Sequence, residues 1–118
     1  EGYDRAMILD AVATGKCPAG TVLCWGREDF RRVVAPSLHF AGLPQLIELA
    51  ERVGIRFPSD LRVVAMEVHD PTVFRETLTL GARQALPSFL AQARRILMDD
   101  WGIRPRPCEE PIICTNTP

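Results

Sequence analysis

The chain of 118 residues contains no apolar run near the ~20 residues that a membrane-spanning helix requires. It has no excess of positive charge either, since 14 Lys and Arg stand against 15 Asp and Glu, a formal net charge of −1. Electrostatic binding to a nucleic-acid backbone or to an anionic membrane is therefore not expected. The first residues also lack the basic-then-apolar pattern of a signal peptide. We expect a protein with neither a nucleic-acid nor a membrane partner.

Cysteine and histidine are too few for the common structural frameworks. The chain has four Cys and two His, with no C-x-x-C pair, so a structural zinc site is not expected. The cysteines are also too sparse for a disulfide scaffold, which predicts reduced thiols in a cytoplasmic protein. They are Cys17, Cys24, Cys108 and Cys114. The standard catalytic motifs G-x-S-x-G, H-E-x-x-H and the Walker loop are absent as well.

The composition is that of an ordinary globular protein, with 47% hydrophobic and 25% charged residues. A chain of this length predicts one domain, which we place at residues 1–103. Residues 104–118 hold four of the ten prolines and show no periodicity. That segment is predicted to be an exposed tail.

Three apolar runs are typical of strands. The first covers residues 6–9 and stops at Asp10, so it predicts a buried strand with a carboxylate at its carboxyl end. The second covers residues 21–25, and the third covers residues 61–68, which are rich in β-branched side chains.

Two segments have the apolar spacing of helices. Residues 43–53 form an amphipathic pattern that Gly54 closes. A second pattern starts after a predicted N-cap at Thr79, and Pro87 predicts a kink in it or two consecutive helices. The order strand, strand, helix, strand, helix is α/β. Because three strands make a thin core, we expect a fold that lacks an upstream part.

Two residues are the main candidates for chemistry. Asp10 follows a strand and precedes a glycine-containing loop, where a carboxylate can bind a metal or act as a general base. It can equally cap a turn or bond loop amides. His39 precedes the first helix and offers an imidazole ligand, or it simply packs at the helix entry.

A third polar cluster ends the last predicted strand. Glu67 and His69 share one side of an extended chain, and Asp70 follows them. These residues are either a further ligand group or the ordinary polar end of a strand that turns into solvent.

Several of these residues together resemble the nickel-iron hydrogenase maturation endopeptidases. Asp-Ala-Val at residues 10–12, Gly15 and Pro-Ala-Gly-Thr at residues 18–21 are similar to the family stretch Asp-Ala-x-Asp-x-Gly-x-x-Pro-Gly-Thr, with Ala19 as a one-residue insertion. Residues 37–43, Ser-Leu-His-Phe-Ala-Gly-Leu, resemble the segment Ser/Thr-x-His-x-x-x-Leu. The motifs lie in the family's order, and the resemblance extends from about residue 6 to residue 97.

The resemblance implies a function, a site and a fold. Members of the family remove a short C-terminal extension from the precursor of a hydrogenase large subunit after nickel has been inserted. The strand-end aspartate of the family falls on Asp10 and its histidine on His39, which implies that both are catalytic residues and sense the nickel of the substrate. Nickel is then not expected to be permanently bound. The implied fold is an α/β mixed sheet with helices on both faces, here incomplete at the N-terminus.

Two features depart from the family pattern. The N-terminal motif Gly-Asn-x-x-x-x-Asp/Glu-Asp-Gly, which would carry a third nickel ligand, is absent. Ala13 also stands where the family often has an acid. Two alternatives to a working enzyme follow. One is a non-catalytic or truncated binding module that grips the precursor without cleaving it, and the other is an unrelated α/β domain in which Asp10 and His39 are structural.

Overall fold

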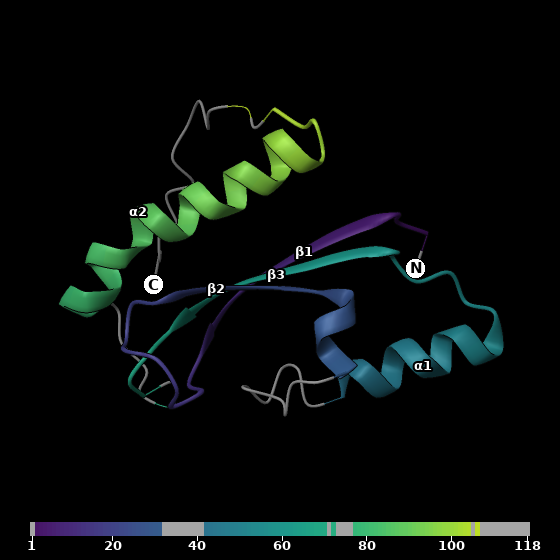
Figure 1. Cartoon of the computed structure of the whole chain (residues 1–118), viewed down its shortest axis with the longest axis horizontal. Coiled ribbons are helices and arrows are strands. Elements are labelled where there is room, and N and C mark those ends of the chain that lie inside the picture. The colour runs from purple at the N-terminus through teal and green to yellow at the C-terminus, as the bar shows by residue number, and fades with distance from the viewer. Residues whose placement is uncertain (1, 32–41, 71, 73–76, 105, 107–118) are drawn as a thin grey trace, which may run out of the picture.

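The computed structural model describes residues 2–31, 42–70, 72, 77–104 and 106 (Figure 1). In this part of the chain the elements are, in order, β1 (Arg5–Val12), β2 (Val22–Gly26), the 3-10 helix η1 (Arg27–Arg31), α1 (Leu43–Val53), β3 (Asp60–Glu67), α2 (Leu80–Arg95) and the π-helical turn η3 (Ile96–Asp100). Their order confirms the predicted α/β class.

The three described strands form one mixed sheet in the order β1-β3-β2. β1 runs parallel to β3, with Arg5 opposite Asp60 and Val12 opposite Glu67. β2 runs antiparallel to β3, with Val22 opposite Met66. β3 is therefore the central strand, which explains its continuous apolar run, since a strand covered on both faces needs no polar alternation.

Helices cover both faces of the sheet, as the family resemblance implied (Figure 1). On one face, α1 packs over what we call the α1-side core, whose buried residues are Val12, Ile47, Leu61, Val63 and Ala65. On the other face lies the α2-side core, with Val64, Met66, Phe89 and Ile96 buried. Successive residues of β3 contribute to opposite cores because side chains alternate along a strand.

β1 differs from the prediction in length and in burial. It continues two residues beyond Asp10, because its pairing with β3 extends to Val12, whose side chain is fully buried. Asp10 therefore lies inside the strand and not at its end. The predicted strand is present, but Leu9 is 50% exposed, so the prediction that this strand is buried is wrong. In the described sheet β1 is an edge strand, and only part of each of its faces is covered.

The two long helices begin where the sequence predicts. Pro44 lies in the first turn of α1, and Gly54 ends that helix with a φ of 72°, a left-handed conformation that glycine adopts without strain. Thr79 caps α2 by accepting a hydrogen bond from the Ala82 N–H at 3.3 Å. α2 runs through the exposed Pro87 as one helix and not as two. None of the helices in the described ranges has the length and apolar character needed to cross a membrane.

Candidate functional site

Asp10 lies in β1 on the same face as its neighbours two residues away, Ile8 and Val12, which pack in the α1-side core. Its side chain is half-buried, and its Oδ1 accepts a hydrogen bond from the Ala11 N–H at 2.8 Å. A carboxylate held in this way keeps one part in contact with the protein and another part accessible to solvent. That position suits either a ligand or a general base.

Glu67 lies near Asp10, at the last position of β3 and directly opposite Val12. Only 3% of it is exposed. Its carboxylate accepts hydrogen bonds from the Thr14 N–H and the Thr14 hydroxyl, both at 2.9 Å, and from the Gly15 N–H at 3.0 Å. One alternative from the sequence was that this cluster is the polar end of a strand that turns into solvent. For Glu67 that alternative is wrong, because its side chain is buried. His69 and Asp70 are exposed.

The loop between β1 and β2 is held at its far end by the backbone of the same residue. The Gly20 N–H donates to the Glu67 carbonyl at 2.7 Å, and the Glu67 N–H donates to the Thr21 carbonyl at 2.8 Å. Gly20 has a φ of 93°, and a Cβ atom there would lie 3.4 Å from the side chain of Ala85. Glycine is required at this position by its backbone conformation.

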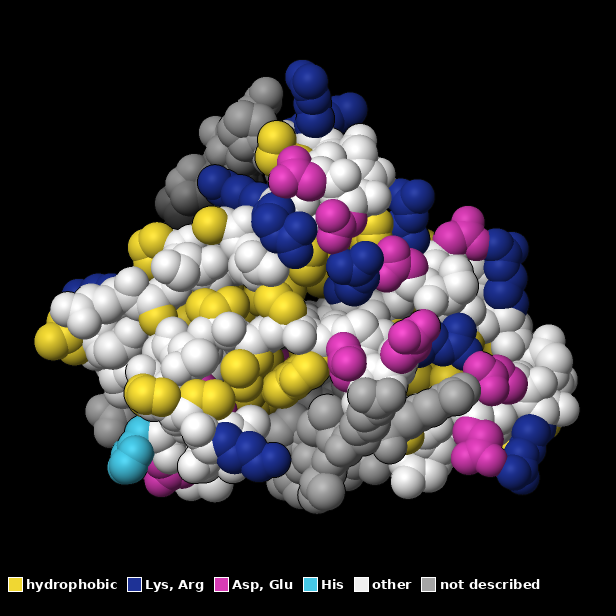
Figure 2. Space-filling model, viewed as in Figure 1, with side chains coloured by type: hydrophobic (Ala, Val, Ile, Leu, Met, Phe, Trp, Pro, Cys, Tyr) yellow, Lys and Arg dark blue, Asp and Glu magenta, His cyan; other side chains and the backbone are white. Residues whose placement is uncertain are grey.

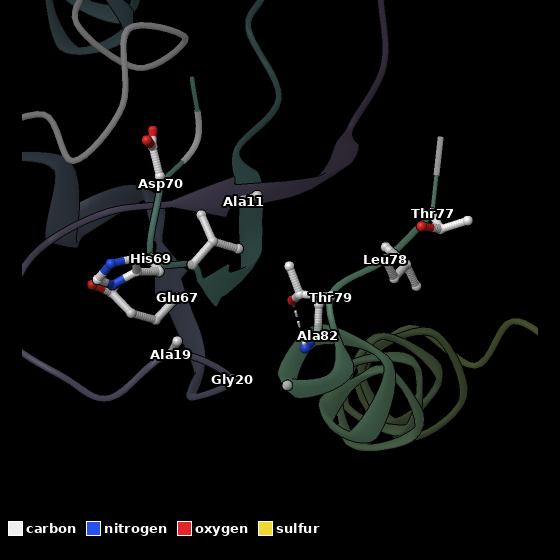
Figure 3. A pocket seen from close by; sticks show the side chains of 12 residues that line it. Ala11, Ala19, Gly20, Glu67, His69, Asp70, Thr77, Leu78, Thr79 and Ala82 are labelled. Carbon is white, nitrogen blue, oxygen red and sulfur yellow. Dashed lines mark hydrogen bonds between the residues drawn. The ribbon is translucent and has the colours of Figure 1, made fainter. Parts of the chain in front are cut away.

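A groove of about 490 Å³ lies between the carboxyl end of the sheet and the start of α2, and the loop residues Ala19 and Gly20 form part of its lining (Figure 3). Small or apolar side chains supply most of its walls, while Thr79 and the end of β3 add polar groups. Figure 2 shows hydrophobic side chains gathered along this part of the surface. The lining residues include Ala11, Ala19, Gly20, His69, Leu78 and Ala82.

Asp10 and the groove are neighbours at the carboxyl end of the sheet: Glu67, which lies on the Asp10 face, lines the groove together with Ala11 from the opposite face. Ala11 lines the groove, and side chains of consecutive strand residues point to opposite faces. The loop that Glu67 holds runs along the carboxyl end of the two parallel strands and adjoins both features. This is the edge at which ligands of α/β proteins commonly bind.

The second predicted site residue, His39, lies outside the described residues, as do Cys108 and Cys114. The pairing of Asp10 with His39 therefore remains a prediction. Among the described residues, no group of three or more His, Cys, Asp and Glu side chains is arranged to hold a metal ion. Ala13, the departure from the family pattern, is an exposed residue just before Thr14.

A second polar cluster, which sequence analysis did not identify, lies at the opposite end of β3. The Asp60 carboxylate accepts hydrogen bonds from Arg62 Nε at 2.7 Å and from the Trp101 indole N–H at 2.8 Å. Burial acts to raise the pKa of Asp60, but these hydrogen bonds and the charges of Arg62 and Arg5 outweigh it and hold the pKa below its ordinary value. The cluster ties the chain after η3 to the sheet and is structural.

Two solved structures have a fold similar to that of this chain. One solved structure is the hydrogenase maturating endopeptidase HybD from E. coli, with 23% sequence identity and a TM-score of 0.60. Another is the solution structure of an endopeptidase from Escherichia coli, also 23% identical, with a TM-score of 0.61. Each match covers 82% of this chain and 60% of the other. No family model and no curated protein sequence matches the chain.

This chain thus spans about 60% of the length of the solved structures that it matches. At 23% identity the likeness establishes a common fold. One of these neighbours is a hydrogenase maturation endopeptidase, the family that the motifs around Asp10 and His39 resemble. The described part of the chain has the α/β fold of a hydrogenase maturation endopeptidase.

Proposed function

We propose that the protein is an endopeptidase of hydrogenase maturation, which removes the C-terminal extension of a [NiFe]-hydrogenase large-subunit precursor. The observation that carries the proposal is the agreement of two independent lines. The residues around Asp10 follow the family motif, and the fold matches HybD over 82% of this chain. Asp10 lies two residues before the carboxyl end of β1, which runs parallel to β3, and it is half-buried beside an anchored loop.

The reaction is the addition of water across one amide bond. The C–N bond of the substrate breaks, the hydroxyl of water joins the carbonyl carbon, and a proton passes to the leaving nitrogen. In the proposed role, the Asp10 carboxylate accepts the proton of the attacking water and returns it to the amine. The side chain of Asp10 is partly exposed, so water can reach its carboxylate.

Nickel enters this proposal as a feature of the substrate. The precursor carries the metal, and the protein meets it only while the precursor is bound. The carboxylate oxygens of Asp10 and an imidazole nitrogen of His39 are donor types that suit a borderline divalent metal such as nickel. We accordingly propose that both residues sense the loaded state of the precursor, and that no nickel stays with the protein after cleavage.

The alternative is a binding module of the same family that grips the precursor without cleaving it. One observation favours it: the exposed Ala13 stands where the family often has an acid. Binding and cleavage must therefore be measured separately.

The test uses the nickel-loaded large-subunit precursor encoded in the same genome. We expect the wild-type chain to shorten it, as seen by mass spectrometry, and to leave the nickel-free precursor intact. Asp10→Asn and His39→Ala are each expected to reduce the cleavage rate by at least about 100-fold, because a general acid–base group contributes roughly 10²–10⁴-fold. The variants should remain folded by circular dichroism.

Glu48→Gln is the matched control, since Glu48 is an exposed acid of α1 whose only described ion pair is with Arg52. It should cleave at the wild-type rate. Binding without cleavage by the wild-type chain would establish the alternative. Cleavage at the normal rate by Asp10→Asn would show that the role assigned to Asp10 is wrong.

A further inference from the structure

We propose that Glu67 is a positioning residue for cleavage: it fixes the loop that leads away from Asp10 and so fixes how the substrate meets Asp10. This inference rests on the proposed function. Nothing in the sequence motif assigns a role to Glu67, which lies 57 positions after Asp10 in the chain.

Burying an acid at this place costs free energy. Glu67 is 3% exposed, and the residues before it on the same face, Val63 and Ala65, are apolar and fully buried. An apolar side chain would continue that pattern at no desolvation cost. The acid is tolerated because three donors converge on its carboxylate, and hydrogen bonds to a carboxylate are among the stronger ones in proteins.

The donors to the Glu67 carboxylate come from the loop that follows Asp10. All three belong to Thr14 and Gly15, which begin the loop four and five residues after Asp10. The backbone of Glu67 holds the other end of the same loop through Gly20 and Thr21. One residue of the central strand therefore anchors both ends of the loop that follows Asp10 and that lines the groove with Ala19 and Gly20.

The Thr14 hydroxyl takes part in two hydrogen bonds. It donates to Glu67 Oε2 at 2.9 Å and accepts from the Lys16 N–H at 3.1 Å. Two linked hydrogen bonds thus connect Glu67 of β3 through Thr14 to the turn at Lys16. Among the described residues, no buried side-chain nitrogen or oxygen lacks a hydrogen-bond partner, so this arrangement is fully satisfied.

The test compares Glu67→Gln, Thr14→Val and Thr14→Ser with the wild-type chain in the precursor-cleavage assay. Gln keeps the shape of Glu67 but turns one acceptor oxygen into a donor that faces other donors. Val removes the Thr14 hydroxyl at equal shape, and Ser restores it. We expect the first two variants to lose about 10- to 100-fold in kcat, the range that a displacement near 1 Å produces.

KM should change by less than about 3-fold, because Glu67 does not contact the substrate in this proposal, and Thr14→Ser should keep a kcat close to wild type. Rates are compared at a temperature where circular dichroism shows every variant fully folded. Amide shifts of Gly15 and Gly20 in two-dimensional NMR report directly on the loop and should move in Glu67→Gln and Thr14→Val.

Each remaining outcome decides a different point. Unchanged kcat in Glu67→Gln with shifted Gly15 and Gly20 amides would show that the anchor is structural only. Unchanged amide shifts would show that the anchor itself is wrong. A wild-type chain that binds the precursor and cleaves nothing would overturn the proposed function, and the role of Glu67 in cleavage with it.

Discussion

Asp10 and Glu67 show how one kind of side chain takes two different positions at one end of a sheet. Asp10 is half-buried and accepts a hydrogen bond from the adjacent Ala11 N–H. Glu67 is almost wholly buried and accepts three hydrogen bonds from one turn of the loop. Because Asp10 is more accessible to solvent, it is the candidate reactive group, whereas the buried Glu67 holds the loop in place.

These two residues also differ in how well the sequence predicts them. Asp10 is identified by a local motif, in which the glycines and the proline that follow it are all within eleven positions. The burial of Glu67 depends on donors 52 and 53 positions away, so no local pattern distinguishes it from an acid that ends a strand in solvent. His39 was predicted from a motif, and it lies outside the described residues.

At the opposite end of β3, Asp60 gives a prediction about pH. Its pKa lies below the ordinary 3.8 in the folded state, chiefly because hydrogen bonds from Arg62 and Trp101 overcome the effect of burial. The stabilisation is therefore present above about pH 4 and is lost as the pH falls through the folded pKa. Asp60→Asn should lower the free energy of unfolding by about 1 kcal/mol at pH 6.

Urea unfolding at pH 6 and at pH 2.5 measures this difference. The gap between wild type and Asp60→Asn should shrink at the lower pH, because the carboxyl of the unfolded wild-type chain is then protonated and part of the stabilisation is lost. Asp99→Asn, at an exposed acid of η3, should show little change at either pH. A gap that is equally large at both pH values would mean that the charge of Asp60 does not stabilise the fold.

Among the elements, the helices and the central strand follow from periodicity, because their burial pattern is set by their own residues. α1 and β3 lie within one residue of their predicted bounds, and Thr79 caps α2 as predicted. β1 was predicted poorly, with Leu9 half-exposed, because the burial of a strand depends on which strands and helices flank it. That information is not local to residues 6–9.

Pro87 interrupts the backbone hydrogen bonds of α2. It lies inside α2, where it supplies no N–H for a bond to the carbonyl of Arg83, yet the helix continues to Arg95. Packing of Phe89, Ala93 and Ile96 against the sheet holds this segment in place. Replacing the exposed Pro87 by Ala should therefore stabilise the protein by about 1–2 kcal/mol, since proline in a helix interior costs roughly 3 and its rigidity in the unfolded chain returns up to about 1.

Thermal and urea unfolding of Pro87→Ala measure the gain. Ser88→Ala is the control, because it is the next exposed position of the helix and contains no proline. It should change the free energy of unfolding by less than about 0.5 kcal/mol. A destabilised Pro87→Ala would indicate that the proline ring makes contacts worth more than the missing helical hydrogen bond.

At the scale of the whole molecule, β3 connects two cores that share no side chain. Val63 belongs to the α1-side core and Val64 to the α2-side core, and both are fully buried. The same backbone pairs with β1 and β2. Because neither helix can keep its face buried without this strand, the described fold should unfold as one cooperative unit.

The two tryptophans allow this cooperativity to be measured from both sides. Trp25 packs against the α1-side core and Trp101 against the α2-side core. Trp101→Phe leaves Trp25 as the fluorescent reporter of one face, and Trp25→Phe leaves Trp101 for the other. In each background the fluorescence transition in urea should coincide with the far-ultraviolet circular dichroism transition.

Val63→Ala and Val64→Ala should each lower the free energy of unfolding by about 2 kcal/mol, because methyl groups are lost and a cavity forms. Fluorescence and circular dichroism should report the same decrease. Separate midpoints for fluorescence and circular dichroism, or a Val63→Ala effect confined to Trp25, would mean that the two faces of β3 unfold independently.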